Sequence, residues 1–198
     1  MLKNRSENFI REIQPSEEMI TLCDYFLEWF HNNNEIHYPG TIGADGHTDP
    51  TVKISTDFNL KNTTDPKVLF KYTKYLTQIH RMVDNYLGGV TLPLEGYKLR
   101  AGQGGANLQW YKPGEGFFQW HSERSPGSHF NDRWLVFMTY LDTPTEGGGT
   151  EFFYQDTVIK AEKGKTVLWP SEYTHAHRGQ VCPHDHKHIL TGWLYPHK

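Results

Sequence analysis

Two features of the sequence predict a mainly β fold with flanking helices. Residues 17–32 and 65–87 carry apolar side chains at three-and-four spacing, which predicts two amphipathic helices in the N-terminal half. The second half consists of short strand-like runs separated by Gly and Pro turns. Many short strands behind two helices are typical of a double-stranded β-helix, or jelly roll, buttressed by N-terminal α-helices. At 198 residues the chain is long enough for one domain with a sizeable core, and this length argues against two.

The first hundred residues are expected to support the strands. Residues 8–14 alternate enough for a short strand, and Pro15-Ser16-Glu17-Glu18 supplies a helix start with acidic first-turn residues. This helix is expected to run to about Asn32. Residues 33–62 are rich in Gly, Asn, Asp and Pro and predict a loop with short strands near residues 52–55. A loop of this length is either a lid over a pocket or a surface connection.

The stretch from Asp65 to Leu87 predicts the longest helix, ended by Gly88-Gly89. Its apolar face is expected to consist of Val68, Leu69, Tyr72, Tyr75, Leu76, Ile79, Met82, Val83 and Tyr86. Such a stripe predicts packing against a sheet.

Residues 106–112 predict a strand with an unusual alternation. Asn107, Gln109 and Tyr111 share one face, and Leu108 and Trp110 share the other. The polar face either lines a pocket inside the barrel or lies in water. Residues 134–141 are almost continuously apolar, which predicts a strand buried on both faces. Further strands are predicted over residues 151–154, 157–160 and 166–169.

A candidate metal site begins at Trp120-His121-Ser122-Glu123. In an extended segment His121 and Glu123 project to the same side, because alternate residues share a face. Two histidines and one carboxylate form the facial triad of non-haem Fe(II) oxygenases, which leaves three coordination positions open. A His-x-Glu pair alone is a weak signal, but His177 follows on a remote segment and Lys187 lies ten residues beyond it. A buried cation there could pair with a carboxylate of an acidic co-substrate.

These residues resemble the prolyl 4-hydroxylase-like branch of the Fe(II)/2-oxoglutarate-dependent dioxygenases, including its small phage and bacterial members. The matching pieces are Tyr111-Lys112-Pro113-Gly114, His121-x-Glu123, Arg133, Tyr140-Leu141-Asp142, Gly148-Gly149-Thr150-Glu151-Phe152, His177 and Lys187-x3-Thr191-x-Trp193. The resemblance covers residues 100–195 firmly and the preceding residues only loosely. It implies one domain over residues 1–198, with a helical support and loop region (1–100) and a jelly-roll catalytic core (101–198).

The resemblance also implies the cofactors and their binding residues. Fe(II) would be held by His121, Glu123 and His177, and 2-oxoglutarate by Lys187 with Tyr111 and Thr191. Dioxygen is the other co-substrate, with ascorbate as a candidate reductant. The implied reaction hydroxylates an unactivated C–H bond, of a prolyl residue in a peptide first and of a free amino acid next, and decarboxylates 2-oxoglutarate to succinate. Arg124 and Trp193 are candidate substrate contacts.

Two positions depart from the family pattern. The family's usual ligand pair is His-x-Asp, whereas this chain has Glu123, which keeps the charge on a longer side chain. A halogenase relative would have lost this carboxylate, so hydroxylation is favoured. Many prolyl hydroxylases carry a threonine three residues after the strand arginine, where this chain has Val136.

Several alternatives stay open on the sequence alone. His175 could replace His177 as the distal ligand, and the histidine-rich tract 183–188 either forms a second metal site or is solvated. The rival functions are a metal-binding, cupin-like jelly roll without oxygenase activity and a cupin-type Zn or Mn isomerase, which would work without oxygen. A metal-binding module would have no reason to place Lys187 ten residues past the last ligand.

Composition limits the possible partners and compartment. A net charge of -3 gives no general attraction to nucleic acid or to an anionic membrane. No run of about 18 apolar residues and no leader is visible, so we expect a cytoplasmic protein. Cys23 and Cys182 are expected to be two reduced thiols.

Overall fold

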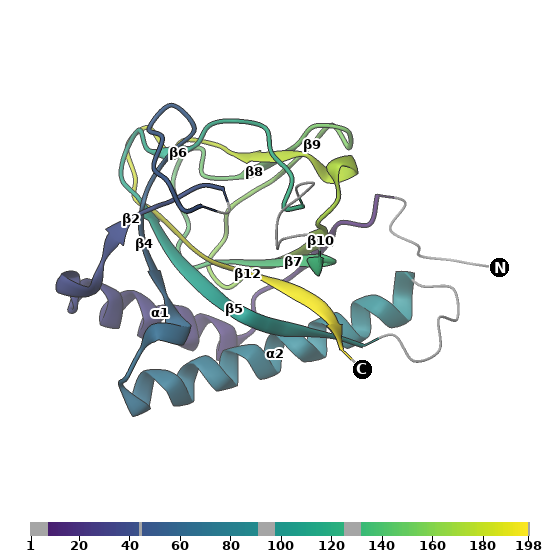
Figure 1. Ribbon diagram of the computed structural model, residues 1–198, viewed down its shortest axis with the longest axis horizontal. Coiled ribbons are helices and arrows are strands. Elements are labelled where there is room, and N and C mark those ends of the chain that lie inside the picture. Colours follow the sequence, from purple (N-terminus) through teal and green to yellow (C-terminus); the bar gives the residue numbers. More distant parts are fainter. Residues whose placement is uncertain (1–7, 44, 91–97, 125–131, 198) are drawn as a thin grey trace.

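The computed structural model describes residues 8–43, 45–90, 98–124 and 132–197. Figure 1 shows a layered molecule in which helices α1 and α2 lie against one side of a large sheet, with smaller strands on the other side. This is the predicted double-stranded β-helix buttressed by N-terminal helices. Among the described residues, no helix is both long enough and apolar enough to cross a membrane.

The helices are α1 (Glu17–His31) and α2 (Pro66–Val90), with short 3-10 turns at Asn34–Ile36, Leu60–Asn62 and Tyr173–His175. The strands are β1 (Arg11–Ile13), β2 (Tyr38–Pro39), β3 (Lys53–Ile54), β4 (Thr56–Asn59), β5 (Lys98–Tyr111), β6 (Gly116–Phe117), β7 (Leu135–Tyr140), β8 (Thr150–Phe152), β9 (Thr157–Ile159), β10 (Thr166–Pro170), β11 (His177–Gly179) and β12 (Lys187–His197).

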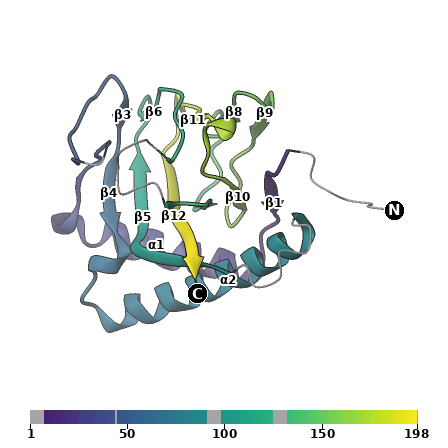
Figure 2. The ribbon, with the colours of Figure 1, turned by 45° about the vertical axis from the view of Figure 1, so that its right-hand side comes forward.

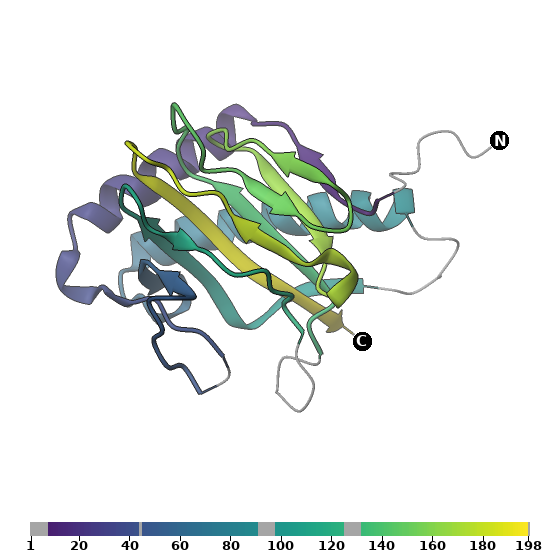
Figure 3. The same cartoon turned by 90° about the horizontal axis from the view of Figure 1, so that it is seen from above.

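The strands form two sheets that face each other and one short ladder. The large sheet has the order β1-β10-β7-β12-β5-β4-β2, the small sheet has the order β11-β8-β9, and β3 pairs with β6. All of these pairings are antiparallel. Figure 2 and Figure 3 show the small sheet over one face of the large sheet and the helices over the other. The large sheet is therefore covered on both faces.

The two helices bury the outer face of the large sheet. Ser16 caps the start of α1, and its hydroxyl accepts a hydrogen bond from the Met19 backbone N–H at 3.2 Å. Tyr75 of α2 is buried, and its hydroxyl lies 2.9 Å from that of Thr139 in β7. Each fully buried large apolar side chain contributes about 1.5–3 kcal/mol to stability. The helix–sheet core contains Met19, Leu22, Phe26, Phe30, Val68, Tyr72, Ile79, Val83, Phe137, Leu168 and Leu190.

Three sequence predictions about the N-terminal half are corrected. α2 continues through Gly88-Gly89 to Val90, because two glycines lower helix stability without forbidding the helix. Leu69 is 52% exposed and does not belong to the buried stripe. Residues 33–62 contain more strand than predicted. They contain β3, as expected, and also β4, which lies between β2 and β5 in the large sheet.

The predicted strands of the second half are found with shifted ends. β5 begins at Lys98, well before the predicted residue 106, and pairs with β12 along almost its whole length. All six residues of β7 are buried, which confirms a strand covered on both faces. Both cysteines are free and buried, as expected.

Candidate active site

A cavity of about 480 Å³ lies between the two sheets. Its walls come from β4, β5, β7, β11 and β12, and residues 41–43 contribute from the N-terminal half. Asn107, Gln109 and Tyr111 all line it, which confirms that the polar face of β5 looks into the barrel. The cavity is concave and supplied with a few polar groups, as ligand sites usually are.

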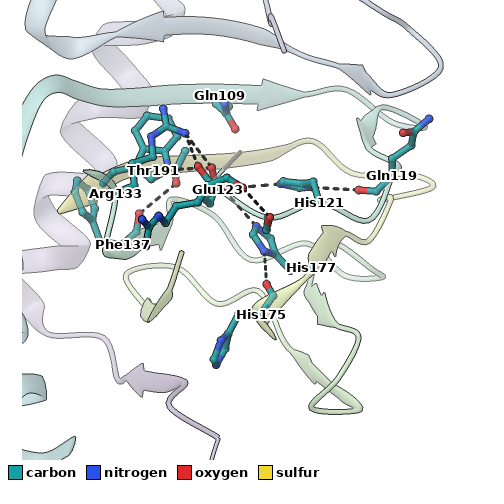
Figure 4. A network of polar contacts seen from close by, with 12 residues as sticks. Gln109, Gln119, His121, Glu123, Arg133, Phe137, His175, His177 and Thr191 are labelled. Carbon is teal, nitrogen blue, oxygen red and sulfur yellow. Dashed lines mark hydrogen bonds and ion pairs between the residues drawn. The ribbon is translucent and has the colours of Figure 1, made fainter. Parts of the chain in front are cut away.

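Three side chains converge at this cavity from distant parts of the chain. His121 and His177 exchange two backbone hydrogen bonds, at 3.0 and 2.9 Å, which bring the segment after β6 against β11. Glu123 Oε1 lies 3.4 Å from His177 Nε2 and 3.9 Å from His121 Nε2. Within the described ranges, this is the only group of three or more His, Cys, Asp or Glu side chains arranged closely enough to hold a metal ion. Figure 4 shows the three side chains directed toward one another.

Backbone carbonyls orient both imidazoles. His121 Nδ1 lies 3.0 Å from the Gln119 carbonyl oxygen, and His177 Nδ1 lies 2.9 Å from that of His175. Donation from each Nδ1–H leaves each Nε2 lone pair facing Glu123. Burial, reinforced by the charge of His177, lowers the pKa of His121 to about 4. The imidazole of His121 is therefore neutral at neutral pH, as a metal ligand must be.

Glu123 is ionised although it is buried. Burial raises its pKa, but the contacts with the imidazoles of His177 and His121 and with the Arg133 guanidinium lower it to about 2 overall. Its second oxygen, Oε2, accepts a hydrogen bond from Trp193 Nε1 at 2.9 Å. Two imidazole nitrogens and one carboxylate oxygen, all within 4.8 Å of one another, could hold a divalent iron ion.

Lys187 lines the same cavity as the three convergent side chains. It is the first residue of β12 and stands opposite Tyr111 of β5 in the sheet register. Its side chain is buried, and its Nζ lies 3.4 Å from the Gly149 carbonyl oxygen. No carboxylate of the described residues lies within ion-pair distance of Nζ. Burial lowers the pKa of Lys187 to about 8, so this ammonium could receive a carboxylate from a ligand.

The other two predicted co-substrate residues also line the cavity. The Tyr111 hydroxyl donates to Gln109 Oε1 at 2.8 Å, and the Thr191 hydroxyl donates to the Phe137 carbonyl at 3.2 Å. In this structure both hydroxyl protons are therefore donated to acceptors of the protein. Val136 faces Trp193 across the β7–β12 ladder and is fully buried.

The remaining predicted residues have different surroundings. Arg124 forms an ion pair with Glu172 and is absent from the cavity wall among the described residues. His175 directs its Nε2 to the Asn8 carbonyl oxygen at 2.9 Å, away from the cluster, so the geometry favours His177. In the histidine-rich tract, His188 is buried, and its Nδ1 lies 2.5 Å from an Asp142 carboxylate oxygen.

The cavity wall also contains a buried ion pair that the sequence analysis did not predict. Lys53 Nζ lies 2.7 Å from Asp57 Oδ2, and both side chains are almost fully buried. Ser55 and Gln109 also donate hydrogen bonds to Asp57, at 2.7 and 3.3 Å. Gly40 crosses closely above this group, because a Cβ there would lie 2.0 Å from Ser55 Oγ. No spacing signal marks such a pair, since its members meet only when β3 and β4 fold.

The comparisons with known proteins agree with this geometry. Residues 106–195 match the model of the 2OG-Fe(II) oxygenase superfamily. No curated protein is similar enough in sequence to count as a match.

Three of the solved structures with the same fold are prolyl hydroxylases. A Trichoplax adhaerens prolyl hydroxylase, solved with a hypoxia-inducible factor peptide, has a TM-score of 0.74 at 15% identity, over 98% of this chain and 86% of that one. A Pseudomonas putida prolyl-4-hydroxylase has a TM-score of 0.69 at 14% identity, over 100% and 97%. The collagen prolyl hydroxylase of Paramecium bursaria Chlorella virus-1, solved with 2-oxoglutarate, has a TM-score of 0.67 at 18% identity, over 95% and 96%. Residues 106–195 are therefore similar in sequence to the 2OG-Fe(II) oxygenase superfamily, and the chain as a whole has a prolyl 4-hydroxylase-like fold.

Proposed function

We propose that this protein is an Fe(II)- and 2-oxoglutarate-dependent hydroxylase that acts on a residue inside a peptide, with a prolyl residue as the first candidate. The observation that carries the proposal is a single cavity that holds both a two-histidine, one-carboxylate cluster and a buried lysine without an acidic partner among the described residues. His121, Glu123 and His177 would hold the iron, and Lys187 would bind the distal carboxylate of 2-oxoglutarate.

Iron and 2-oxoglutarate, when bound, supply the oxidising power that transfers one oxygen atom of O2 to a C–H bond while the co-substrate becomes succinate. The chain's own residues would hold the iron and orient 2-oxoglutarate. The carbonyl-bound Nδ1 atoms fix His121 and His177, and the buried ammonium of Lys187 fixes the far end of the diacid.

The charges in the cavity favour an internal residue over a free amino acid. Apart from Lys187, the Lys, Arg, Asp and Glu side chains on the described cavity wall pair with one another, Lys53 with Asp57 at 2.7 Å and Arg133 with Glu123 at 3.4 Å. Residues 125–131, which follow the ligand pair in sequence, contain no Asp, Glu, Lys or Arg. A free amino acid brings an ammonium and a carboxylate, and each would cost several kcal/mol to desolvate without a partner. A residue within a peptide has neither charge at the reacting position.

Succinate formation tests the activity. Protein purified without oxygen is incubated with Fe(II), 2-oxoglutarate and O2, with proline-containing peptides or free amino acids, and both succinate and a mass gain of one oxygen atom are measured. We expect peptide-dependent succinate and an oxygenated peptide, and no stimulation by free proline.

The matched control is His121→Ala. This variant is expected to abolish turnover. His47 is an exposed histidine outside the cavity, so His47→Ala should leave turnover intact. If the unaltered protein forms no more succinate than His121→Ala with every peptide and amino acid, the hydroxylase proposal is wrong and the metal-binding module is favoured. Oxygenation of free amino acids alone would overturn only the choice of a peptide substrate.

A further inference from the structure

The two carboxylate oxygens of Glu123 have different surroundings. Oε1 faces the histidines, 3.4 Å from His177 Nε2 and 3.9 Å from His121 Nε2. Oε2 faces the opposite way and accepts from Trp193 Nε1 at 2.9 Å and from an Arg133 guanidinium nitrogen at 3.4 Å. The carboxylate is therefore divided between a metal-facing oxygen and a protein-facing oxygen.

Arg133 and Trp193, the two residues that contact Oε2, stack on each other. The Arg133 guanidinium carbon lies 3.5 Å from the centre of the Trp193 ring, and the same guanidinium nitrogen also reaches the Glu123 backbone carbonyl at 3.2 Å. Arg133 precedes β7 and Trp193 lies in β12, neighbouring strands in the large sheet. Arg133 is buried, and the Glu123 side chain is only 15% exposed. The sheet thus holds the indole N–H at a fixed place beside the carboxylate.

A glutamate needs this support more than an aspartate does. Its extra methylene adds a rotatable bond, so an unsupported carboxylate can swing away from the metal position or turn both oxygens toward it. The second arrangement would occupy one of the three positions that a facial triad leaves open. Hydrogen bonds to an ionised oxygen are stronger than those between neutral groups, and here they oppose both movements.

We propose that Trp193 and Arg133 are positioning residues that make Glu123 a ligand through Oε1 alone. This inference rests on the proposed function, because it assumes a metal ion at the three-residue cluster. It assigns to Trp193 a role in orienting the metal ligand, in place of the substrate contact expected from the sequence.

We call the contacts of Trp193 and Arg133 with Glu123 the clamp. Co(II) binding tests the clamp without turnover. The affinity for Co(II) and its visible absorption are measured without 2-oxoglutarate for the unaltered protein, Trp193→Phe and Arg133→Gln. Loss of a hydrogen bond to a metal ligand typically lowers metal affinity about 10- to 100-fold, and we expect a loss in this range and an altered spectrum for both variants. The matched control is Trp110→Phe, whose indole N–H donates to His186 at 3.0 Å outside the cavity and which should bind Co(II) normally.

Glu123→Asp provides a second readout that a purely structural role would not change. A shorter carboxylate cannot reach both the metal position and Trp193, so we expect Trp193→Phe to cost much less Co(II) affinity in the Glu123→Asp background. Equal costs in the two backgrounds, or unchanged affinity and spectrum in both clamp variants, would refute the clamp. If the unaltered protein itself binds no Co(II) and forms no succinate, the proposed function fails and the clamp fails with it. If it binds Co(II), failure of the clamp alone is recognisable.

Discussion

Lys187 supplies the positive charge that would recognise the distal carboxylate of the acidic co-substrate in the proposed function. A charge-assisted hydrogen bond contributes about 1.5–3 kcal/mol, so Lys187→Met should raise the KM for 2-oxoglutarate roughly 10- to 100-fold. Succinate formation over a series of 2-oxoglutarate concentrations measures this change. Lys165→Met is the matched control, because Lys165 is also buried but pairs with Glu12 and Glu162 away from the cavity. An equal rise in KM for both variants would contradict the assignment.

The pH dependence of 2-oxoglutarate binding follows from the same side chain. Burial lowers the pKa of Lys187 to about 8, so the ammonium is present below that pH and is lost as the pH rises through it. A bound carboxylate favours the charged form, so affinity should fall as the pH rises above about 8. Calorimetric titration at a series of pH values measures the fall. Lys187→Arg, whose guanidinium stays charged, should remove the fall even if it binds more weakly. A flat profile in the unaltered protein would show that Lys187 does not bind the diacid.

Between β3 and β4, the buried pair of Lys53 and Asp57 predicts a large stability effect. Removing one partner of a buried ion pair leaves an uncompensated charge, so Lys53→Met should lower the free energy of unfolding by about 3–5 kcal/mol. The double variant Lys53→Met, Asp57→Leu should lose less, because no charge remains buried. Urea unfolding measures both. Lys163→Met breaks an exposed pair with Asp24 and should cost at most about 1 kcal/mol. A larger loss in the double variant than in Lys53→Met would contradict this account.

The elements that the sequence predicts well are those with strong periodicity. α1, α2 and β7 follow from apolar spacing alone, because their buried faces set the pattern. β4 could not be predicted, since it consists of Thr-Asp-Phe-Asn and both Asp and Asn disfavour strands. Pairing with β5 and the contacts of Asp57 outweigh this preference. A tertiary contact leaves no periodic signal in the sequence.

The candidate site, too, was predictable from the sequence only in part. The convergence of His121, Glu123 and His177 was predictable from spacing and from the family resemblance. The contacts of Trp193 with Glu123 were not, because they depend on how β12 closes against β7.

At the scale of the whole molecule, the two faces of the large sheet have different roles. Helices α1 and α2 cover the outer face and supply much of the apolar core. The inner face carries the polar side chains of β5 and β12 and forms the cavity with the small sheet. The large sheet separates the helices from the cavity. Substitutions in the outer core should therefore lower the stability of the protein before they change the geometry of the cavity.

Buried and half-buried histidines predict how the stability of the whole molecule depends on pH. Burial is the main cause that lowers the pKa of His37, His80 and His175 below the usual 6.5. Below pH 6.5 the unfolded chain therefore binds more protons than the folded one. The free energy of unfolding should fall as the pH drops from about 7.5 to about 5, each histidine adding a slope of at most about 1.4 kcal/mol per pH unit.

His80 allows this prediction to be tested at one position. Its Nε2 accepts a hydrogen bond from the Ala101 backbone N–H at 3.1 Å, which protonation would break. In urea unfolding at several pH values, His80→Gln should give a shallower fall of stability in acid than the unaltered protein. His184→Gln, at an exposed position, should leave the slope unchanged. If His80→Gln has the slope of the unaltered protein, protonation of His80 does not contribute to acid unfolding, and the fall must come from the other histidines or from carboxylates.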